Sequence, residues 1–321
     1  MTKLAEPLFD RVALIGLGLM GSSLAHAIRR HGLARHLAGH APSAQTRAAA
    51  LELGLVETVH DDAAAAATEA DLVILCTPVG AVGEVARRIA PVLKAGAIVS
   101  DVGSVKQSII ADVTPHLAKG VHFVPAHPIA GTEQSGPRSG FAELFERRWC
   151  ILTPLTQGTS PGYAGAVAKV ADFWRGCGSM VEEMDAKHHD LVLAITSHVP
   201  HLIAYNIVGT AADLETVTRS EVIKYSAGGF RDFTRIAASD PTMWRDVFLN
   251  NKEAVLEMPG RFIEDLSALQ RMIRWGDGNA LFELFARTRA IRRSIIDAGQ
   301  EIDEPDFGRW HGDPHDGEAE D

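Results

Sequence analysis

Short apolar runs alternate with longer amphipathic stretches through the first half of the chain. Six strand-like runs, most of them rich in Val, Ile and Leu as buried strands are, cover residues 12–15, 37–39, 72–76, 98–100, 121–124 and 150–152. Helical patterns occupy residues 21–31, 45–54, 63–67, 79–92, a stretch from 104 onward, and 164–175, and a short segment at 180–183 closes the series. Strands that alternate with helices predict an α/β fold with a doubly wound parallel sheet.

The second half of the chain has no comparable strand-like runs. Helical patterns cover residues 186–209, which are largely apolar from Leu191, and then 216–222, 241–256 and 261–296. Asp240 followed by Pro241 is a typical helix start. We therefore expect an α/β domain over residues 1–184 and an all-α domain over 185–299. Long apolar helices of this kind commonly pack against a second subunit, so we expect a homodimer formed through the helical domain.

Composition narrows the class of protein. The chain has 321 residues, enough for about two domains, and 46% of them are apolar. Of the net charge of −10, most lies in residues 300–321, which are acidic, rich in Gly and Pro, and expected to be disordered. The remainder is nearly neutral, which argues against a nucleic-acid partner. No signal peptide and no run of about 18 apolar residues is apparent, so we expect a cytoplasmic protein without a membrane partner.

Cysteine usage gives no sign of a disulfide framework or a thiolate zinc site. The three cysteines, Cys76, Cys150 and Cys177, are far apart and form no Cys-x-x-Cys pair. Cys76 lies in a predicted buried strand. We expect no metal ion.

A glycine-rich turn follows the first predicted strand. Gly16, Gly18 and Gly21 form G-x-G-x-x-G, with Leu19 and Met20 between the last two. The first glycine permits the tight turn, the second lets a pyrophosphate approach the backbone, and the third allows close helix–strand packing. The motif leaves a strand, opens a helix and begins a βαβ series, which is the required context. We expect a Rossmann-like domain that binds a dinucleotide.

The end of the second strand lacks the acid that usually binds the adenosine ribose. No Asp or Glu occurs between Gly16 and Glu52. His40, Ser43 or Arg47 could instead contact a 2′-phosphate. The sequence leaves NAD and NADP equally open as cofactors.

Several chemically active residues follow predicted strands of the sheet. In open α/β sheets the carboxyl ends of the strands bind ligands. Here they carry Thr77 and Pro78, the stretch 101–106 with Ser104, and His127. Histidine exchanges protons near neutral pH, so His127 is a candidate general base. Ser104 could bond His127 and fix its tautomer, or cap the next helix.

The long helix of the second half carries Ser197, His198, Pro200 and His201. The two histidines are three residues apart and share a face, and Pro200 predicts a bend. A bend with two histidines in an apolar helix indicates a ligand pocket; no acid pair or H-E-x-x-H pattern supports a metal site. His188 and His189, near the helix start, are expected to be solvated.

A glycine-led segment, residues 228–235, is expected to be a loop and carries two arginines. Arg side chains bind carboxylates with two parallel hydrogen bonds, so Arg231 and Arg235 are candidates to hold an acidic substrate. The alternative for Arg231 is a surface ion pair with Asp232.

Together these motifs resemble a known family, the prephenate/arogenate (cyclohexadienyl) dehydrogenases of tyrosine biosynthesis. The resemblance rests on GLGLMG, DVGSVK, HPIAGTEQSG, SHVPH and GGFRDFTRIA, which occur in this order and span roughly residues 10 to 300. It implies a nucleotide-binding domain, a helical dimer-forming domain, and oxidative decarboxylation of a cyclohexadienyl substrate with hydride transfer to NAD or NADP. The family often has an acid where Ala41 stands, which leaves the choice of cofactor open.

The resemblance also implies roles for individual residues. His127 would hydrogen-bond the ring hydroxyl and take its proton, Ser104 would orient His127 and contact the same hydroxyl, and Arg235 would bind a substrate carboxylate. Other residues would line or border the substrate pocket, with Asp232 as a gate: Ser197, His201, the Gly228 backbone, Thr132, Glu133 and Trp244.

Other enzyme classes fit less well. β-Hydroxyacid dehydrogenases carry a lysine in the first long helix of the second domain, and residues 188–210 contain none. Short-chain reductases need Tyr-x-x-x-Lys, which none of the three tyrosines provides. A non-catalytic nucleotide sensor would keep the glycine turn without needing His127, Ser104 and Arg235 together. The residues do not decide between prephenate and arogenate, or whether tyrosine inhibits.

Overall fold

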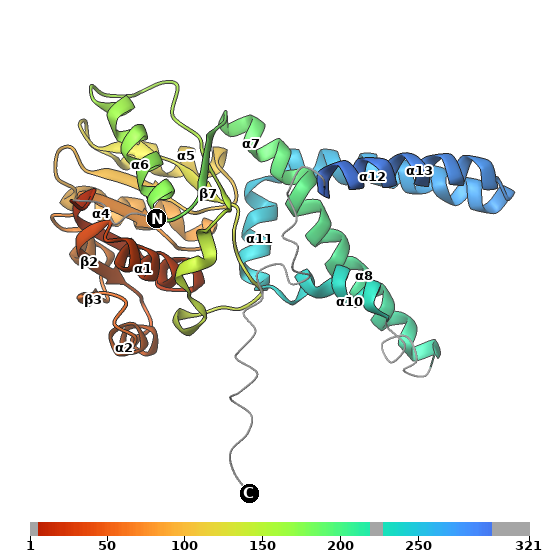
Figure 1. Ribbon diagram of the computed structural model, residues 1–321, viewed down its shortest axis with the longest axis horizontal. Helices are drawn as coiled ribbons and strands as arrows, with labels where there is room; N and C mark the ends of the chain where they lie inside the picture. The colour runs from red at the N-terminus through yellow and green to blue at the C-terminus, as the bar shows by residue number, and fades with distance from the viewer. Residues whose placement is uncertain (1–5, 219–226, 297–321) are drawn as a thin grey trace, which may run out of the picture. The chain divides into compact units, whose positions relative to one another are not determined.

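A computed structural model describes residues 6–218 and 227–296 (Figure 1). A six-stranded sheet with all strands parallel forms its centre, in the order β3-β2-β1-β4-β5-β6. The strands are β1 (Phe9–Ile15), β2 (Ala34–His40), β3 (Thr58–His60), β4 (Leu72–Leu75), β5 (Ile98–Asp101) and β6 (His122–Val124). This order confirms the predicted doubly wound sheet. β3 was not predicted from the sequence, because its three residues are of mixed polarity and form no apolar run.

Helices cover both faces of the sheet. They are α1 (Leu19–His31), α2 (Ala44–Glu52), α3 (Ala63–Ala67), α4 (Val82–Ile89), α5 (Gln107–Val113) and α6 (Tyr163–Gly176), with short 3-10 turns at Val79–Ala81, Ala90–Val92 and Thr114–His116. One apolar core packs the sheet against α1 and α6 and is centred on Leu24, Phe173 and Trp174. A second core packs the other face against α3, α4 and α5. Burial on both faces explains why the strands are continuous apolar runs.

A second, smaller sheet stands beside the first. It consists of β7 (Ala126–Pro128), β8 (Trp149–Leu152) and β9 (Met180–Glu183), with β7 antiparallel to β8 and β8 parallel to β9. Between β7 and β8 lie two 3-10 turns, Pro137–Ser139 and Ala142–Phe145. His127 is therefore in a strand of its own rather than in a loop after β6, and its backbone is fixed by pairing with Ile151.

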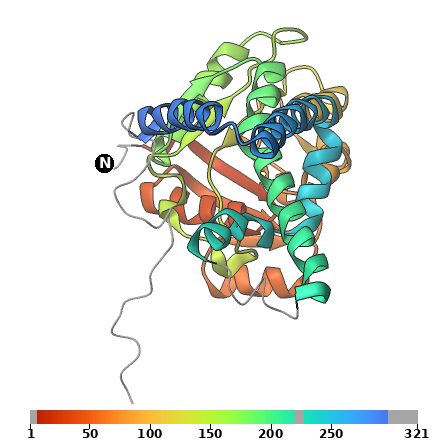
Figure 2. The same ribbon diagram turned by 90° about the vertical axis from the view of Figure 1, so that its right-hand side faces the viewer.

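Helices make up the described part of the chain after β9. They are α7 (Ala186–Leu193), a π-helical turn (Ala194–His198), α8 (Val199–Thr218), α10 (Gly228–Thr234), a 3-10 turn (Arg235–Ala238), α11 (Pro241–Asn250), α12 (Lys252–Trp275) and α13 (Gly278–Ile295). α8 is a long helix that runs on from the π turn (green to turquoise in Figures 1 and 2). The expected helix at 216–222 lies mostly outside the described residues, as does the acidic tail. The helices expected at 241–256 and 261–296 are each interrupted, at Asn251 and at Gly276, which has a positive φ of 68°.

By internal contacts the chain forms two compact units, Met1–Met258 and Pro259–Asp321, and the boundary falls inside α12. The first unit therefore contains both sheets together with α7, α8, α10 and α11. Within it, α11 packs against the turn Val79–Ala81, and α5 packs against α7. In the second unit, α13 has no buried residue, and α12 and α13 expose large apolar side chains there: Phe262, Ile263, Leu266, Ile273, Trp275, Phe282, Phe285 and Ile291.

One helical run in the described residues, Ala186–Asp213, is long and apolar enough to cross a membrane by length and composition alone. This differs from the expectation that the sequence contains no such run. Core helices of soluble proteins pass the same test, and 28% of the relevant window is buried inside the structure.

Candidate active site

The glycine turn between β1 and α1 has the shape that a dinucleotide phosphate requires. Gly16 has a φ of 106°, and a Cβ there would lie 2.6 Å from the Cys76 carbonyl oxygen. A Cβ on Gly21 would lie 1.9 Å from the Gly16 carbonyl oxygen, so both positions need glycine. At Gly18, the residue before the helix, a Cβ would meet nothing within 4 Å. The turn thus leaves open space at the amino end of α1, which fits a pyrophosphate.

The end of β2 uses most of its polar groups in local structure. Ser43 caps α2 by accepting from the Thr46 amide at 3.4 Å. The Arg47 guanidinium donates to the carbonyl oxygens of Ala41 and Pro42, both at 2.8 Å. Of the three predicted phosphate contacts, only His40 has a buried ring nitrogen, Nδ1, without a partner among the described residues. Burial lowers the pKa of His40.

His127 is buried, and its Nδ1 lies 2.8 Å from Nε2 of His189. His189 in turn has its Nδ1 2.9 Å from a carboxylate oxygen of Asp190. The same carboxylate accepts from the backbone amides of Lys106, at 2.7 Å, and Gln107, at 2.9 Å. Asp190 therefore caps α5 from α7. The expectation that His189 is solvated is wrong, because its side chain is fully buried, whereas the neighbouring His188 is exposed.

Burial lowers the pKa of His127 well below its ordinary value, and the nearby positive charge of Lys106 lowers it further. Lys106 is fully buried and forms an ion pair with Asp101. Its ammonium also donates to the carbonyl oxygen of Ala126 at 2.8 Å, while Asp101 accepts from the Ala126 amide at 3.2 Å. This pair joins the end of β5 to β7, next to His127. Burial and Lys106 together favour the neutral form of the His127 imidazole, and the pairing of β7 fixes its position. A general base needs both properties.

Ser104 does not take either of its two expected roles in this structure. The helix α5 begins at Gln107, three residues later, and it is capped by Asp190. The Nδ1 atom of His127 is bonded to His189, so Ser104 does not fix the tautomer through that atom. The backbone of Ser104 lies against His198 instead.

The π-helical turn Ala194–His198 breaks the long helix just before Pro200, where the sequence predicts a bend. Such turns are frequent at functional sites. His198 is fully buried, and its Nδ1 lies 3.1 Å from Nδ2 of Asn251, which also donates to the Asp190 carbonyl oxygen at 2.8 Å. Since Nδ2 is a donor, Nδ1 of His198 is the acceptor. Burial lowers the pKa of His198 to about 4.

His201 stacks on Trp244, with ring centroids 3.7 Å apart and an angle of 25° between the planes. Its Nδ1 donates to the carbonyl oxygen of Ser197 at 2.8 Å, which leaves Nε2 as an acceptor. Burial lowers the pKa of His201, and Arg235 is near enough to lower it further. The four predicted pocket residues Ser197, His201, Arg235 and Trp244 are thus brought together.

Arg235 forms an ion pair with Glu133 at 3.0 Å, and both side chains are about 30% exposed. Thr132, next to Glu133, accepts from the Gln134 amide at 3.2 Å. The expected loop 228–235 is a helix, α10, in which Gly228 is the first residue. Arg231 and Asp232 are exposed, and no ion pair joins them in the described part of the chain. Of the two arginines, it is Arg235 that pairs with Glu133 and lies near His201.

Comparison with known proteins identifies the group to which this arrangement belongs. The family models described as "Prephenate dehydrogenase, nucleotide-binding domain" and "Prephenate dehydrogenase, dimerization domain" match residues 24–183 and 185–287. The chain is 44% identical to cyclohexadienyl dehydrogenase of Zymomonas mobilis over 89% of its own length and 96% of that protein. The chain belongs to the prephenate dehydrogenase family.

Other members of the prephenate dehydrogenase family agree with this assignment. Prephenate dehydrogenase of Bacillus subtilis is 33% identical over 89% of this chain and 76% of that protein. The crystal structure of prephenate dehydrogenase from A. aeolicus, in complex with hydroxyphenyl propionate and NAD+, superimposes with a TM-score of 0.82 at 34% identity. That match covers 89% of this chain and 98% of that one. The resemblance inferred from the five motifs is confirmed.

The residues that were not predicted from the sequence are those that hold the predicted site residues in place. Lys106 lies inside DVGSVK, yet its burial and its bond to β7 have no local signal. His189 and Asp190 come from α7, and Asn251 lies between α11 and α12; nothing in their spacing indicates His127 or His198 as partners. Groups of three or more His, Cys, Asp or Glu that could hold a metal ion do not occur among the described residues.

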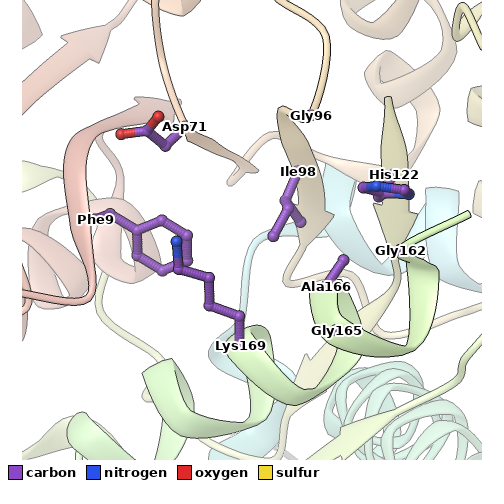
Figure 3. Close-up of a pocket in the computed structure, with 9 residues that line it drawn as sticks. All are labelled: Phe9, Asp71, Gly96, Ile98, His122, Gly162, Gly165, Ala166 and Lys169. Atoms are coloured by element: carbon purple, nitrogen blue, oxygen red, sulfur yellow. The ribbon is translucent and has the colours of Figure 1, made fainter. Parts of the chain in front are cut away.

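A hollow of about 220 Å³ occurs elsewhere, at the amino ends of the strands of the large sheet (Figure 3). The Lys169 ammonium lies over the Phe9 ring there, 4.4 Å from its centroid, and Asp71 is bonded to Lys94. Phe9, Ile98 and His122 are the first residues of β1, β5 and β6. This hollow is at the opposite edge of the sheet from the glycine turn and contains none of the predicted site residues.

Proposed function

We propose that this chain is a cyclohexadienyl dehydrogenase, which oxidises and decarboxylates prephenate, arogenate or both with a nicotinamide dinucleotide. The observation that carries the proposal is the buried, neutral His127 on β7, held beside the loop that follows β5. The glycine turn after β1 opens at the same carboxyl edge of the sheet, as ligand sites in such folds do. The proposal also rests on the names of the relatives, which act on this class of ring.

In the proposed reaction, His127 accepts the proton of the ring hydroxyl at Nε2. When bound, the nicotinamide accepts the hydride that leaves the hydroxyl-bearing carbon. Loss of the ring carboxylate as carbon dioxide then makes the ring aromatic, which drives the step forward. The Gly16–Gly21 turn would hold the pyrophosphate, and Thr77 and Pro78, after β4, would border the cofactor.

The substrate's carboxylates require a cation, and we assign that role to Arg235. Glu133 occupies its guanidinium at 3.0 Å, so a substrate carboxylate would compete with or join this pair. Nε2 of His201, unprotonated or protonated, would contact the substrate. Trp244, which stacks on the His201 ring, would form a wall of the pocket. Ser197, Thr132 and Gly228 would complete the lining.

We further propose that NAD is the preferred cofactor. Nη1 of Arg47 is already engaged with the carbonyl oxygens of Ala41 and Pro42, and the Ser43 hydroxyl caps α2, so fewer of their hydrogen-bonding groups remain for a 2′-phosphate there. The Asp62 carboxylate follows β3 and acts on the pKa of His40, so it places a negative charge at this edge, where it is paired with Arg88. The A. aeolicus structure contains NAD+.

A two-by-two assay of purified enzyme, with prephenate or arogenate and with NAD or NADP, tests these assignments. We expect turnover of both substrates and a kcat/KM for NAD at least about tenfold above that for NADP, a difference of about 1.4 kcal/mol. Turnover of neither substrate would refute the function, and a preference for NADP would refute the cofactor assignment alone. His127→Asn should bind the substrate and lose most of its turnover.

We also propose that the chain is a homodimer, with residues 1–184 and 185–299 as its two domains and the cytoplasm as its location. The exposed apolar side chains of α12 and α13 support a subunit contact, as does the match to the dimerization domain. The helical run Ala186–Asp213 carries His189, His198 and His201 of the site, which favours a domain helix over a membrane span. Light scattering after gel filtration in the absence of detergent should give twice the mass of one chain.

A further inference from the structure

Three buried side chains form a linear chain of hydrogen bonds that ends at the proposed base. Asp190 contacts Nδ1 of His189 at 2.9 Å, and Nε2 of His189 contacts Nδ1 of His127 at 2.8 Å. The two rings meet edge to face, with centroids 5.1 Å apart and an angle of 67°. Both nitrogens of His189 and Nδ1 of His127 each have one partner in this series of hydrogen bonds. The position of the proton on one ring therefore determines its position on the next.

The direction of the chain is set at Asp190. Its carboxylate accepts from the backbone amides of Lys106 and Gln107, which can only donate. Burial by itself would raise the pKa of Asp190, but the hydrogen bonds from His189 and from these two amides hold it below its ordinary value. Asp190 is therefore an ionised carboxylate and a pure acceptor.

Because Asp190 only accepts, Nδ1 of His189 must carry the proton that it donates. Burial lowers the pKa of His189, so the ring is neutral and its Nε2 has a lone pair. That lone pair can only accept, and its one partner is Nδ1 of His127. Nδ1 of His127 must then be the protonated nitrogen, and Nε2 of His127 the free one.

We propose that His189, oriented by Asp190, is a positioning residue that fixes His127 as its Nδ1–H tautomer and so directs the Nε2 lone pair to the substrate hydroxyl. The inference rests on the proposed function, since it concerns the base assigned there. In the step itself the substrate O–H bond breaks and an N–H bond forms at Nε2. The hydride leaves the hydroxyl-bearing carbon with its electron pair and is accepted by the nicotinamide. His127 keeps its bond to His189 throughout, so nothing in the relay rearranges during the reaction.

The opposite tautomer would be inactive. With the proton on Nε2, His127 would present an N–H donor to the hydroxyl and could not accept its proton. The fully buried Lys106, which is paired with Asp101, keeps a positive charge near His127 and disfavours a second proton before the substrate binds. The relay thus sets which nitrogen is free, and burial together with Lys106 keeps it free.

The tautomer can be observed directly, without any variant in the relay. In the wild-type enzyme with NAD bound, 15N spectra of labelled histidines at pH 8 should show His127 and His189 protonated on Nδ1 and unprotonated on Nε2. The His127 signals are identified by their loss in His127→Asn. A His127 ring protonated on Nε2 would overturn the proposal, whatever its activity.

Kinetics of matched variants at position 189 test whether the tautomer matters. His189→Gln places a carbonyl oxygen near the position of Nε2 and can still accept from His127, so kcat should stay within a few-fold of wild type. His189→Leu removes the acceptor, and kcat should fall at least about tenfold, with KM for the substrate within about twofold. His188→Leu, one residue earlier and exposed, should match the wild type in both constants.

The outcomes separate this inference from the proposed function. If His127→Asn keeps full turnover, the base assignment itself fails. If His127→Asn loses turnover while His189→Leu keeps its kcat, only the relay is refuted. Equal losses in the Gln and Leu variants, both folded by near-ultraviolet circular dichroism, would indicate a packing role and would also refute it.

Discussion

His198 is a buried imidazole whose titration should weaken the fold as the pH falls. It is fully buried, and burial lowers its pKa to about 4. In the unfolded chain a histidine has a pKa of about 6.5. Between these two values the unfolded state binds a proton that the folded state does not bind. The stabilisation by neutral His198 is complete above pH 6.5 and is lost as the pH falls through the window down to about 4.

The size of the effect follows from the two pKa values. Within the window the free energy of unfolding falls by up to about 1.4 kcal/mol per pH unit for one such group. Integrated between pH 7.5 and pH 5, the loss from His198 alone is about 2 kcal/mol. His198→Gln removes the titrating group, while its carbonyl oxygen can still accept from Asn251. The variant should therefore be less stable than the wild type at pH 7.5 but lose less stability on acidification.

Urea unfolding followed by tryptophan fluorescence at pH 7.5 and pH 5 measures this difference. We expect the stability gap between the wild type and His198→Gln to narrow by about 2 kcal/mol at the lower pH. His188→Gln, at an exposed position, is the control, and its gap should not change with pH. A gap for His198→Gln that is the same at both pH values, or wider at pH 5, would refute the assignment of a neutral, buried His198.

Three further outcomes test the cofactor turn, the substrate cation and the base. Gly18→Ala should keep the melting temperature, because a Cβ there meets nothing within 4 Å, and it should raise the KM for the cofactor. Gly21→Ala should lower the melting temperature by several degrees or prevent folding. The reverse pattern in thermal melts and kinetics would contradict both expectations. Arg235→Gln should raise the substrate KM about tenfold or more with little change in kcat, and a pure kcat loss would count against its role. Because burial lowers the pKa of His127, the neutral base persists below pH 6.5, so kcat/KM should fall only as the pH drops further; an acid limb centred above pH 7 would be inconsistent with this site.

The parts of the fold that sequence predicts are those with a strong local signal. The apolar runs of β1, β4 and β5 are buried on both faces, so their hydrophobic pattern alone identifies them. The glycine turn is equally local, because the requirement at Gly21 comes from a carbonyl oxygen only five residues earlier. β3 pairs with β2 alone and carries polar residues, so no periodicity indicates it.

The supporting residues of the site are not predictable in this way. His188 and His189 are adjacent in sequence, and one step along a helix turns a side chain by about 100°. Which of the two is buried depends on how α7 docks against α5 and β7, and the partner His127 is 62 residues away. The engagement of Ser43 and Arg47 is likewise decided by local hydrogen bonds that composition cannot reveal. Sequence therefore identified the residues proposed to contact ligands and missed those that orient them.

The docking of α7 links the position of the site to its chemistry. Asp190 caps α5 through the amides of Lys106 and Gln107, and the same carboxylate holds His189 against His127. The loop after β5 and the proposed base are thus fixed by one side chain from the helical part of the chain. A shift of α7 would disturb both at once, because the cap and the relay share their acceptor. An isolated buried charge would be costly, but three donors satisfy this carboxylate: the backbone amides of Lys106 and Gln107 and the ring of His189.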